Sequence, residues 1–213
     1  MSVATTTLIL IRHGETALNV ENIFRGRTDI PLNANGREQA ARLAEALRTL
    51  PLAAVYSSPM DRAMATAAPL AAAHGLAAQP AAAFHNICLG EWEGRSKRDV
   101  QREHPELWHQ WVHDPEHIRI PGGETLADLR ARVGEGLAGI LAAHAGATVA
   151  VVSHRSVLKA ALAVILGLEG RYFWKFYLDN GAYTSVEHRA DIGYTITRLN
   201  EGCHLGERTE ELF

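Results

Sequence analysis

The sequence predicts an α/β protein whose mostly parallel sheet is covered by helices on both faces and has an antiparallel edge. Short runs of β-branched residues and leucine alternate with longer segments in which apolar residues recur at helical spacing. Near the end of the chain, residues 183–188 and 194–200 are β-rich and flank Asp191-Ile192-Gly193, as the strands of a hairpin would. This hairpin is expected to form the antiparallel edge, and the earlier strands the parallel part.

Length and composition indicate an ordinary folded protein. The 213 residues suit one domain spanning residues 1–213, with residues 84–123 as a cap insertion. A content of 47% hydrophobic and 21% charged residues excludes a disordered chain or a fibre. The formal net charge of −3 gives no reason to expect a nucleic acid or an anionic membrane as a partner. An anion site must therefore be a local cluster of basic residues.

The sequence favours a cytoplasmic location. Cys88 and Cys203 lack the spacing of a disulfide scaffold or a CxxC motif. The N-terminal residues have no basic leader, and their apolar run is too short for a signal peptide. Gly136–Ser153 carries no charge, but its pattern changes midway from helical to strand-like. We therefore expect a helix end, a turn and a buried strand there, and no contact with the membrane.

The first third of the chain is expected to contain two strands and one helix. Thr5–Ile11 is a run of β-branched residues and leucine, which predicts a buried strand. After a polar loop, Arg37–Leu50 has apolar residues at helical spacing, and Asn33 is suited to cap this helix. Ala53–Ser57 predicts the second strand.

The middle of the chain is expected to be less regular. Ser58-Pro59 provides the favoured cap and first-turn residues of a helix, which Pro69 should end or kink. A brief strand is expected near Ala78. The residues from Phe84 to Gly123 are rich in tryptophan, histidine and proline and predict a small helical cap.

The last third returns to a regular alternation. Thr125 is expected to open a long helix with one apolar face, formed by Leu126, Leu129, Val133, Leu137 and Ile140. Thr148–Ser153 predicts another buried strand. Ser153 is suited to cap a helix over Val157–Leu166, with Gly167 past its end.

Basic side chains gather where the predicted strands end. Arg12 and His13 come directly after the first strand, His154 follows the fourth, and Arg62 lies in the first turn of the helix after the second. The carboxyl ends of parallel strands share one edge of the sheet, where ligands bind. Bringing these side chains together is unfavourable unless an anion joins them, and arginine matches phosphate oxygens bidentately. The pattern predicts a phosphoryl-transfer pocket.

A set of motifs resembles the histidine phosphatase superfamily in its phosphoglycerate-mutase-like branch. In chain order the motifs are RHGET, DIPLNANGREQA, SSPMDRAMATA, GEWEG, GGETL, VVSHRSV and NGAYTSVEHR, and the likeness covers about residues 7–205. The resemblance implies a three-layer α/β/α sandwich with no cofactor and no metal. It also implies a covalent phosphohistidine on His13, with Arg12, Arg62 and His154 contacting the transferred phosphoryl group.

Four further residues are predicted to bind the substrate. Asn19 and Arg25 lie in the loop after the first strand, although a turn residue and a solvated loop would look the same. Asn86 stands where relatives usually have a glutamate that acts as general acid. Arg155 stands where many relatives have glycine, and it adds positive charge near the pocket.

The amide at Asn86 leaves three alternatives open. In the first alternative, Glu91 or another acid supplies the proton, although a structural role is favoured for Glu91. In the second, the substrate has a good leaving group, such as that of an aryl phosphate, an acyl phosphate, an anhydride or phosphohistidine. In the third, the protein binds phosphate compounds and turns them over slowly. General acid catalysis is typically worth ~10²–10⁴-fold, so its loss is tolerable only with a good leaving group.

We therefore expect a phosphatase that hydrolyses a small phosphorylated metabolite and is similar to α-ribazole phosphatases and broad-specificity relatives. The alternatives are a phosphoglycerate mutase and, because of Asn86, a non-catalytic module that binds phosphate ligands. His109 and His113 could share a helix face, but no second motif completes a zinc pattern, so no metal site is expected. A homodimer is compatible with the sequence, although no feature demonstrates it.

Overall fold

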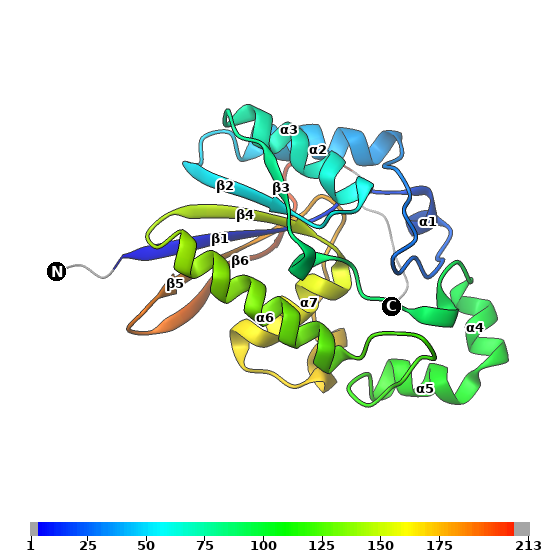
Figure 1. Ribbon diagram of the computed structural model, residues 1–213. Helices are drawn as coiled ribbons and strands as arrows, with labels where there is room; N and C mark the ends of the chain where they lie inside the picture. The colour runs from blue at the N-terminus through cyan, green and yellow to red at the C-terminus, as the bar shows by residue number, and fades with distance from the viewer. Residues whose placement is uncertain (1–3, 207–213) are drawn as a thin grey trace.

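The computed structural model describes residues 4–206 and contains one six-stranded sheet with the order β3-β2-β4-β1-β5-β6 (Figure 1). The strands are β1 (Thr5–Arg12), β2 (Leu52–Ser57), β3 (Ala78–Pro80), β4 (Thr148–Ser153), β5 (Tyr183–Arg189) and β6 (Gly193–Glu201). The pairs β1–β4, β2–β4 and β2–β3 are parallel, whereas β1–β5 and β5–β6 are antiparallel. The predicted sheet, with its antiparallel hairpin at one edge, is confirmed.

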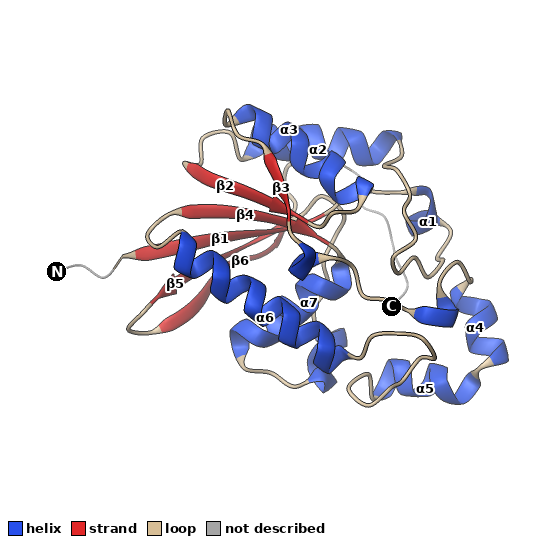
Figure 2. Ribbon diagram, in the orientation of Figure 1, coloured by secondary structure: helices blue, strands red, loops and turns tan. Residues whose placement is uncertain are grey.

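Helices on both faces of the sheet complete a three-layer α/β/α sandwich (Figure 2). The outer layers consist of α2 (Ala34–Ala46) and α3 (Asp61–Ala73) on one face, and of α6 (Leu126–Ala143) and α7 (Arg155–Leu166) on the other. Alternate side chains of β1 divide between two cores. Leu8 and Leu10 pack with α6 and α7, whereas Ile9 and Ile11 pack with α2 and α3. This division is expected of a strand that is buried on both faces.

The predicted caps of α2 and α6 are confirmed. The Asn33 side chain accepts a hydrogen bond from the Gly36 N–H at 2.8 Å, and α2 begins at residue 34, earlier than predicted. Thr125 Oγ1 accepts from the Asp128 N–H at 3.1 Å, and Asp128 Oδ2 accepts in return from the Thr125 N–H at 3.2 Å. The apolar side chains predicted for one face of α6 are all buried.

The helix predicted to begin at Ser58-Pro59 begins instead at Asp61. The N–H of Ser58 donates to the Val152 carbonyl at 2.8 Å, so this residue still follows the edge of β4. The helix does not end at Pro69 but continues to residue 73. Apolar side chains around Pro69 are buried against the sheet, and this burial outweighs the loss of one backbone hydrogen bond.

The predicted cap of α7 is wrong for a similar reason. Ser153 Oγ donates to the Phe84 carbonyl at 2.7 Å instead of capping the helix. His154 is the N-cap, and the helix begins at Arg155, earlier than predicted. Gly167 ends α7 in the left-handed conformation, with φ of 64°, as its position predicted.

The segment 84–123, predicted as a cap, contains the 3₁₀ turn η2 (Gly90–Trp92) and the short helices α4 (Lys97–Glu103) and α5 (Pro105–His113). Three further short elements begin outside this segment, namely α1 (Ala17–Val20), η1 (Ala82–Phe84) and η3 (Gly170–Lys175). Figure 1 shows α4 and α5 beyond the carboxyl ends of the strands. Trp92 and Trp111 are buried against Phe24, with ring centroids 5.1 and 5.9 Å away. The assignment of this segment as a cap insertion in one domain stays a prediction.

The uncharged stretch Gly136–Ser153 divides as predicted into the end of α6, a turn and the strand β4. Among residues 4–206, no helix combines the length and the apolar character that a membrane crossing requires.

The capping contact of Thr125 yields a prediction about stability. Replacement Thr125→Ala removes the acceptor for the Asp128 N–H and should lower the free energy of unfolding by about 1 kcal/mol. Thr125→Ser keeps the hydroxyl and should retain most of the stability. Urea unfolding followed by circular dichroism measures both variants. Equal midpoints for the wild type and Thr125→Ala would contradict the assigned cap.

Candidate active site

The residues predicted to carry the chemistry lie together at the carboxyl ends of β1 and β4. Because these strands pair in parallel with Arg12 beside Ser153, the next residues, His13 and His154, leave the sheet side by side. Their ring centroids are 5.0 Å apart. Arg62, in the first turn of α3, is fully buried, and its charge acts on both histidines.

Hydrogen bonds fix the backbone and the tautomer of His13. Its N–H donates to the Ser153 carbonyl at 2.9 Å, and its carbonyl accepts from Asn180 Nδ2 at 2.9 Å. Nδ1 of the ring lies 2.7 Å from the Gly14 carbonyl oxygen, which can only accept. We therefore assign the ring proton to Nδ1, which leaves the lone pair of the neutral ring on Nε2. Such a nitrogen is a nucleophile.

Only glycine fits directly after His13. A Cβ atom on Gly14 would lie 2.4 Å from the Gly36 carbonyl oxygen, at the start of α2. The Gly14 N–H also donates to Thr66 Oγ1 of α3 at 3.0 Å. The loop that carries the histidine is thus packed directly on both helices of one layer.

Burial and positive neighbours keep both histidines neutral. Burial lowers the pKa of His13 well below the ordinary histidine value, and the charges of Arg62 and Arg12 lower it further. The pKa of His154 is lowered in the same way, first by burial and then by Arg62. His13 therefore needs no deprotonation before it attacks a phosphorus atom at neutral pH.

Ser58 is a site residue that the sequence pattern did not reveal, because it was assigned as a helix cap. Its Oγ lies 2.8 Å from Nε2 of His154 and accepts from the Met60 N–H at 3.4 Å. The direction of the hydrogen bond between the Ser58 hydroxyl and Nε2 follows the tautomer of the His154 ring. Nδ1 of His154 and Nε of Arg62 are buried and have no hydrogen-bond partner among the described residues. Buried donors are normally paired, so the unpaired Nε–H of Arg62 indicates an anionic ligand.

Backbone carbonyl oxygens anchor the two buried arginines. Arg62 donates from Nη1 to Thr28 at 2.9 Å and from Nη2 to Gly26 at 3.2 Å. Arg12, which is 3% exposed, donates from Nη1 to Leu178 at 2.7 Å. Burial lowers the pKa of Arg62 to about 10, so its guanidinium is still charged at neutral pH.

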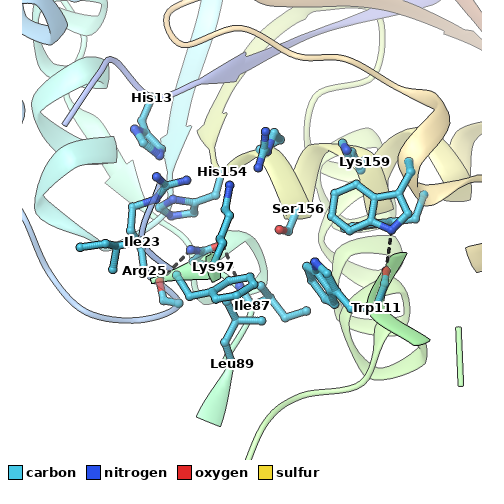
Figure 3. A pocket seen from close by; sticks show the side chains of 16 residues that line it. His13, Ile23, Arg25, Ile87, Leu89, Lys97, Trp111, His154, Ser156 and Lys159 are labelled. Carbon is cyan, nitrogen blue, oxygen red and sulfur yellow. Dashed lines mark hydrogen bonds between the residues drawn. The ribbon is translucent and has the colours of Figure 1, made fainter. Parts of the chain in front are cut away.

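His13 and His154 line a pocket, shown in Figure 3. Its charged lining is entirely cationic, because no Asp or Glu contributes to it within the described part of the chain. The cationic residues are Arg25, Lys97, Arg155 and Lys159, and the aromatic ones are Phe24, Trp111, Phe173 and Trp174. The pocket can therefore accept an anion that also carries an apolar part.

The structure places most of the predicted binding residues at this pocket. Arg25, Asn86 and Arg155 line it, whereas Arg12 and Arg62 are not among the lining residues. Asn19 lies elsewhere, at the start of α1, where its Oδ1 accepts from the N–H and the hydroxyl of Thr16 at 3.0 and 2.8 Å. These contacts shape the loop after β1, and binding of the substrate by Asn19 stays a prediction.

Asn86 occupies the pocket without offering an acidic proton. Its Nδ2 donates to the Gly26 carbonyl at 2.7 Å, and its Oδ1 accepts from the Ile87 N–H at 2.9 Å. Glu91, the alternative acid, is exposed and is not part of the lining. The structural role favoured for Glu91 agrees with this placement.

Lys97 and Lys159 also line the pocket and were not predicted. Lys159 had a signal in the sequence, since it is the one charged residue in the otherwise apolar run Val157–Leu166. Lys97 had none, because it lies among several charged residues that a solvated helix would also contain.

His109 and His113 do share a face of α5, with ring centroids 4.4 Å apart. Neither lines the pocket. Residues 4–206 contain no group of three or more His, Cys, Asp or Glu side chains placed to hold a metal ion.

Comparison with known proteins shows the family and the fold of the chain. The family model of the histidine phosphatase superfamily (branch 1) matches residues 8–202. Phosphoserine phosphatase 1 from Hydrogenobacter thermophilus is 36% identical over 200 residues, which cover 94% of each chain. A probable phosphoglycerate mutase from Citrobacter koseri is 32% identical over 201 residues, covering 92% of this chain and 93% of that one. The crystal structure of the alpha-ribazole phosphatase from Shigella flexneri matches with a TM-score of 0.82 and 30% identity, covering 92% of this chain and 96% of that one.

The lowered pKa values of the two histidines predict how they titrate. Protonation would place a buried positive charge beside Arg62, so both rings should stay neutral as the pH falls through about 6.5. Inorganic phosphate should raise both pKa values, because an anion favours the cationic ring. Histidine NMR titration, with signals assigned through His13→Ala and His154→Ala, measures this. Titration of His13 at the ordinary value without phosphate would contradict the assigned environment.

Proposed function

This chain belongs to the histidine phosphatase superfamily (branch 1) and is a phosphatase, and we propose that it acts through a phosphohistidine on His13. The observation that carries the proposal is the neutral Nε2 of His13, buried within a cluster of Arg12, Arg62 and His154. Phosphoryl transfer depends mainly on positioning and on neutralising negative charge. This cluster supplies both.

In the first proposed step, the Nε2 lone pair of His13 forms a bond to phosphorus while the bond to the leaving oxygen breaks. The electron pair of the broken bond goes to that oxygen, which departs as an anion or takes up a proton. Arg12, Arg62 and His154 contact the three equatorial oxygens and stabilise the charge of the transition state.

In the second step, a water oxygen attacks the phosphorus of the phosphohistidine, and the phosphorus–nitrogen bond breaks. Its electron pair returns to Nε2, so His13 is neutral again. Orthophosphate is released, and the water proton is lost to solvent or to the leaving group. The net reaction converts a phosphate compound and water into the free leaving group and phosphate.

The leaving group is the feature that limits the substrate. An alkoxide needs a proton as it departs, and the described pocket lining has no carboxyl group to provide one. Asn86 therefore favours substrates whose leaving group is stable as an anion, such as aryl phosphates, acyl phosphates, anhydrides or phosphohistidine. The relative from Hydrogenobacter is named for phosphoserine, whose leaving group is an alkoxide, and that substrate would require another acid here.

Two alternatives differ from this proposal in a measurable way. A mutase, the activity in the name of the Citrobacter relative, returns the phosphoryl group from histidine to a second hydroxyl instead of water. A non-catalytic binding module would bind phosphate ligands and form no phosphohistidine. We propose a cytoplasmic location, supported by the two cysteines, Cys88 and Cys203, whose spacing fits no disulfide scaffold, and we retain a homodimer as a prediction.

The proposal is tested by hydrolysis of para-nitrophenyl phosphate beside the alkyl ester 3-phosphoglycerate, without added metal and with a chelator. The wild type should cleave the aryl ester, and His13→Ala should abolish this activity. Cleavage of neither ester by the wild type, or full activity in His13→Ala, would overturn the phosphohistidine on His13. Formation of 2-phosphoglycerate would instead identify a mutase.

The role of residue 86 has its own test. Asn86→Glu should raise kcat/KM for 3-phosphoglycerate by ~10²-fold or more, because it restores an acid near the leaving oxygen. Asn86→Gln introduces a side chain of the same length as glutamate that has no acidic proton, and it should give no gain in kcat/KM. If both variants behave alike, residue 86 does not control protonation of the leaving group.

A further inference from the structure

The carbonyl group that holds the ring of His13 belongs to the peptide between Gly14 and Glu15. Nδ1 of His13 lies 2.7 Å from this carbonyl oxygen. The N–H of the same peptide donates to Oε1 of Gln39, on α2, at 2.8 Å. In a trans peptide the N–H and the C=O point in opposite directions within one plane. The hydrogen bond to Gln39 therefore also sets the direction of the oxygen that faces the histidine ring.

The preceding peptide is held by the neighbouring helix of the same layer. The Gly14 N–H donates to Oγ1 of Thr66, on α3, at 3.0 Å. The Thr66 hydroxyl donates in turn to the Arg62 carbonyl at 2.7 Å, so its oxygen is left to accept from Gly14. Figure 1 shows α2 and α3 side by side over one face of the sheet. Gly14 is thus held through both of its peptides, one by each helix.

The residue after His13 has little rigidity of its own. Glycine has no side chain to restrict the rotation of its backbone, and only glycine fits here. Thr66 is fully buried and Gln39 is 4% exposed, so water cannot replace either hydrogen bond at low cost. These two side chains therefore supply the rigidity that Gly14 lacks.

We propose that Gln39 and Thr66 are positioning residues, which orient the nucleophile His13 by fixing the two peptides of Gly14. With the Gly14 carbonyl in place, the ring keeps its proton on Nδ1 and its lone pair on Nε2, the nitrogen that attacks phosphorus. Thr66 has a second effect, because its bond to the Arg62 carbonyl joins the nucleophile loop to the helical turn that carries this arginine. The inference rests on the proposed function, since only a ring that attacks needs its lone pair on one particular nitrogen.

Two replacements of similar shape remove one hydrogen bond each. Thr66→Val removes the acceptor of the Gly14 N–H, and Gln39→Met removes the amide oxygen that accepts from the Glu15 N–H. Thr66→Ser keeps the hydroxyl and is the conservative variant.

Thr6→Val is the matched control. Oγ1 of Thr6 also accepts from the N–H of a glycine, Gly146, at 2.9 Å, and Thr6 is 4% exposed. Thr6 lies near the start of β1, whereas His13 follows the end of this strand. The control therefore loses the same kind of buried hydrogen bond at a distance from the nucleophile.

The first measurement is the tautomer of the neutral His13 ring, because ¹⁵N chemical shifts distinguish a protonated ring nitrogen from an unprotonated one. The signals are assigned through His13→Ala. The wild type should carry the proton on Nδ1, whereas Thr66→Val and Gln39→Met should shift part of the population to Nε2. Thr66→Ser and Thr6→Val should match the wild type. A purely structural role would lower stability and leave the tautomer unchanged.

The second measurement is kcat and KM for para-nitrophenyl phosphate. Thr66→Val and Gln39→Met should each lower kcat about 10-fold or more and change KM about threefold or less, because a displaced nucleophile impairs attack more than binding. Thr66→Ser and Thr6→Val should keep kcat within about threefold of the wild type.

A wild-type ring with its proton on Nε2 overturns the proposal, and this result does not depend on whether the variants fold. An unchanged tautomer and an unchanged kcat in both Thr66→Val and Gln39→Met also overturn it, and so does an equal loss of kcat in Thr6→Val. Failure of the proposed function gives a different result, since hydrolysis would then persist in His13→Ala.

Discussion

The parallel pairing of β1 with β4 is the interaction on which the site depends. Its register sets Arg12 beside Ser153, so that His13 and His154 leave the sheet as neighbours. A slip of one residue would turn one of the two histidines to the opposite face. The side chains that precede them prevent such a slip, because they alternate between the core under α6 and α7 and the core under α2 and α3. Apolar packing of both layers therefore fixes the geometry of a polar site.

The same placement buries the positive charges of Arg12 and Arg62 away from solvent. These buried charges have two effects. Carbonyl oxygens anchor Arg62 through both Nη atoms, and Asp29, 3.9 Å from Arg62 and 47% exposed, offsets little of the charge of this arginine. Arg62 thus remains available to an anion. The same charge, together with burial, keeps His13 neutral and nucleophilic. One electrostatic environment prepares both the nucleophile and the stabilisation of the transition state.

Local pattern predicted the layers and the main cluster well, and it failed where a side chain serves a distant partner. Asn33 and Thr125 cap their own helices, so spacing alone found them. Ser58 and Ser153 have the same local signal, but their hydroxyl groups contact His154 and the Phe84 carbonyl from other parts of the chain. Lys97 joins the pocket only because α4 folds over the strand ends. The spacing of residues within one segment cannot predict such contacts between distant parts of the chain.

The amide of Asn86 is linked to the anchoring of Arg62 through one carbonyl group. The Gly26 oxygen accepts from Asn86 Nδ2 at 2.7 Å and from Arg62 Nη2 at 3.2 Å, so residue 86 must present a donor toward it. An ionised carboxylate at position 86 would place its own oxygen against the Gly26 oxygen, and the two would repel each other. A protonated acid or an amide can donate a hydrogen bond to the Gly26 oxygen instead. Both side chains that fit keep Arg62 in place, but only the acid has a proton to transfer. The arginine cluster can therefore remain intact while the range of leaving groups narrows, which separates binding of the phosphoryl group from protonation of what departs.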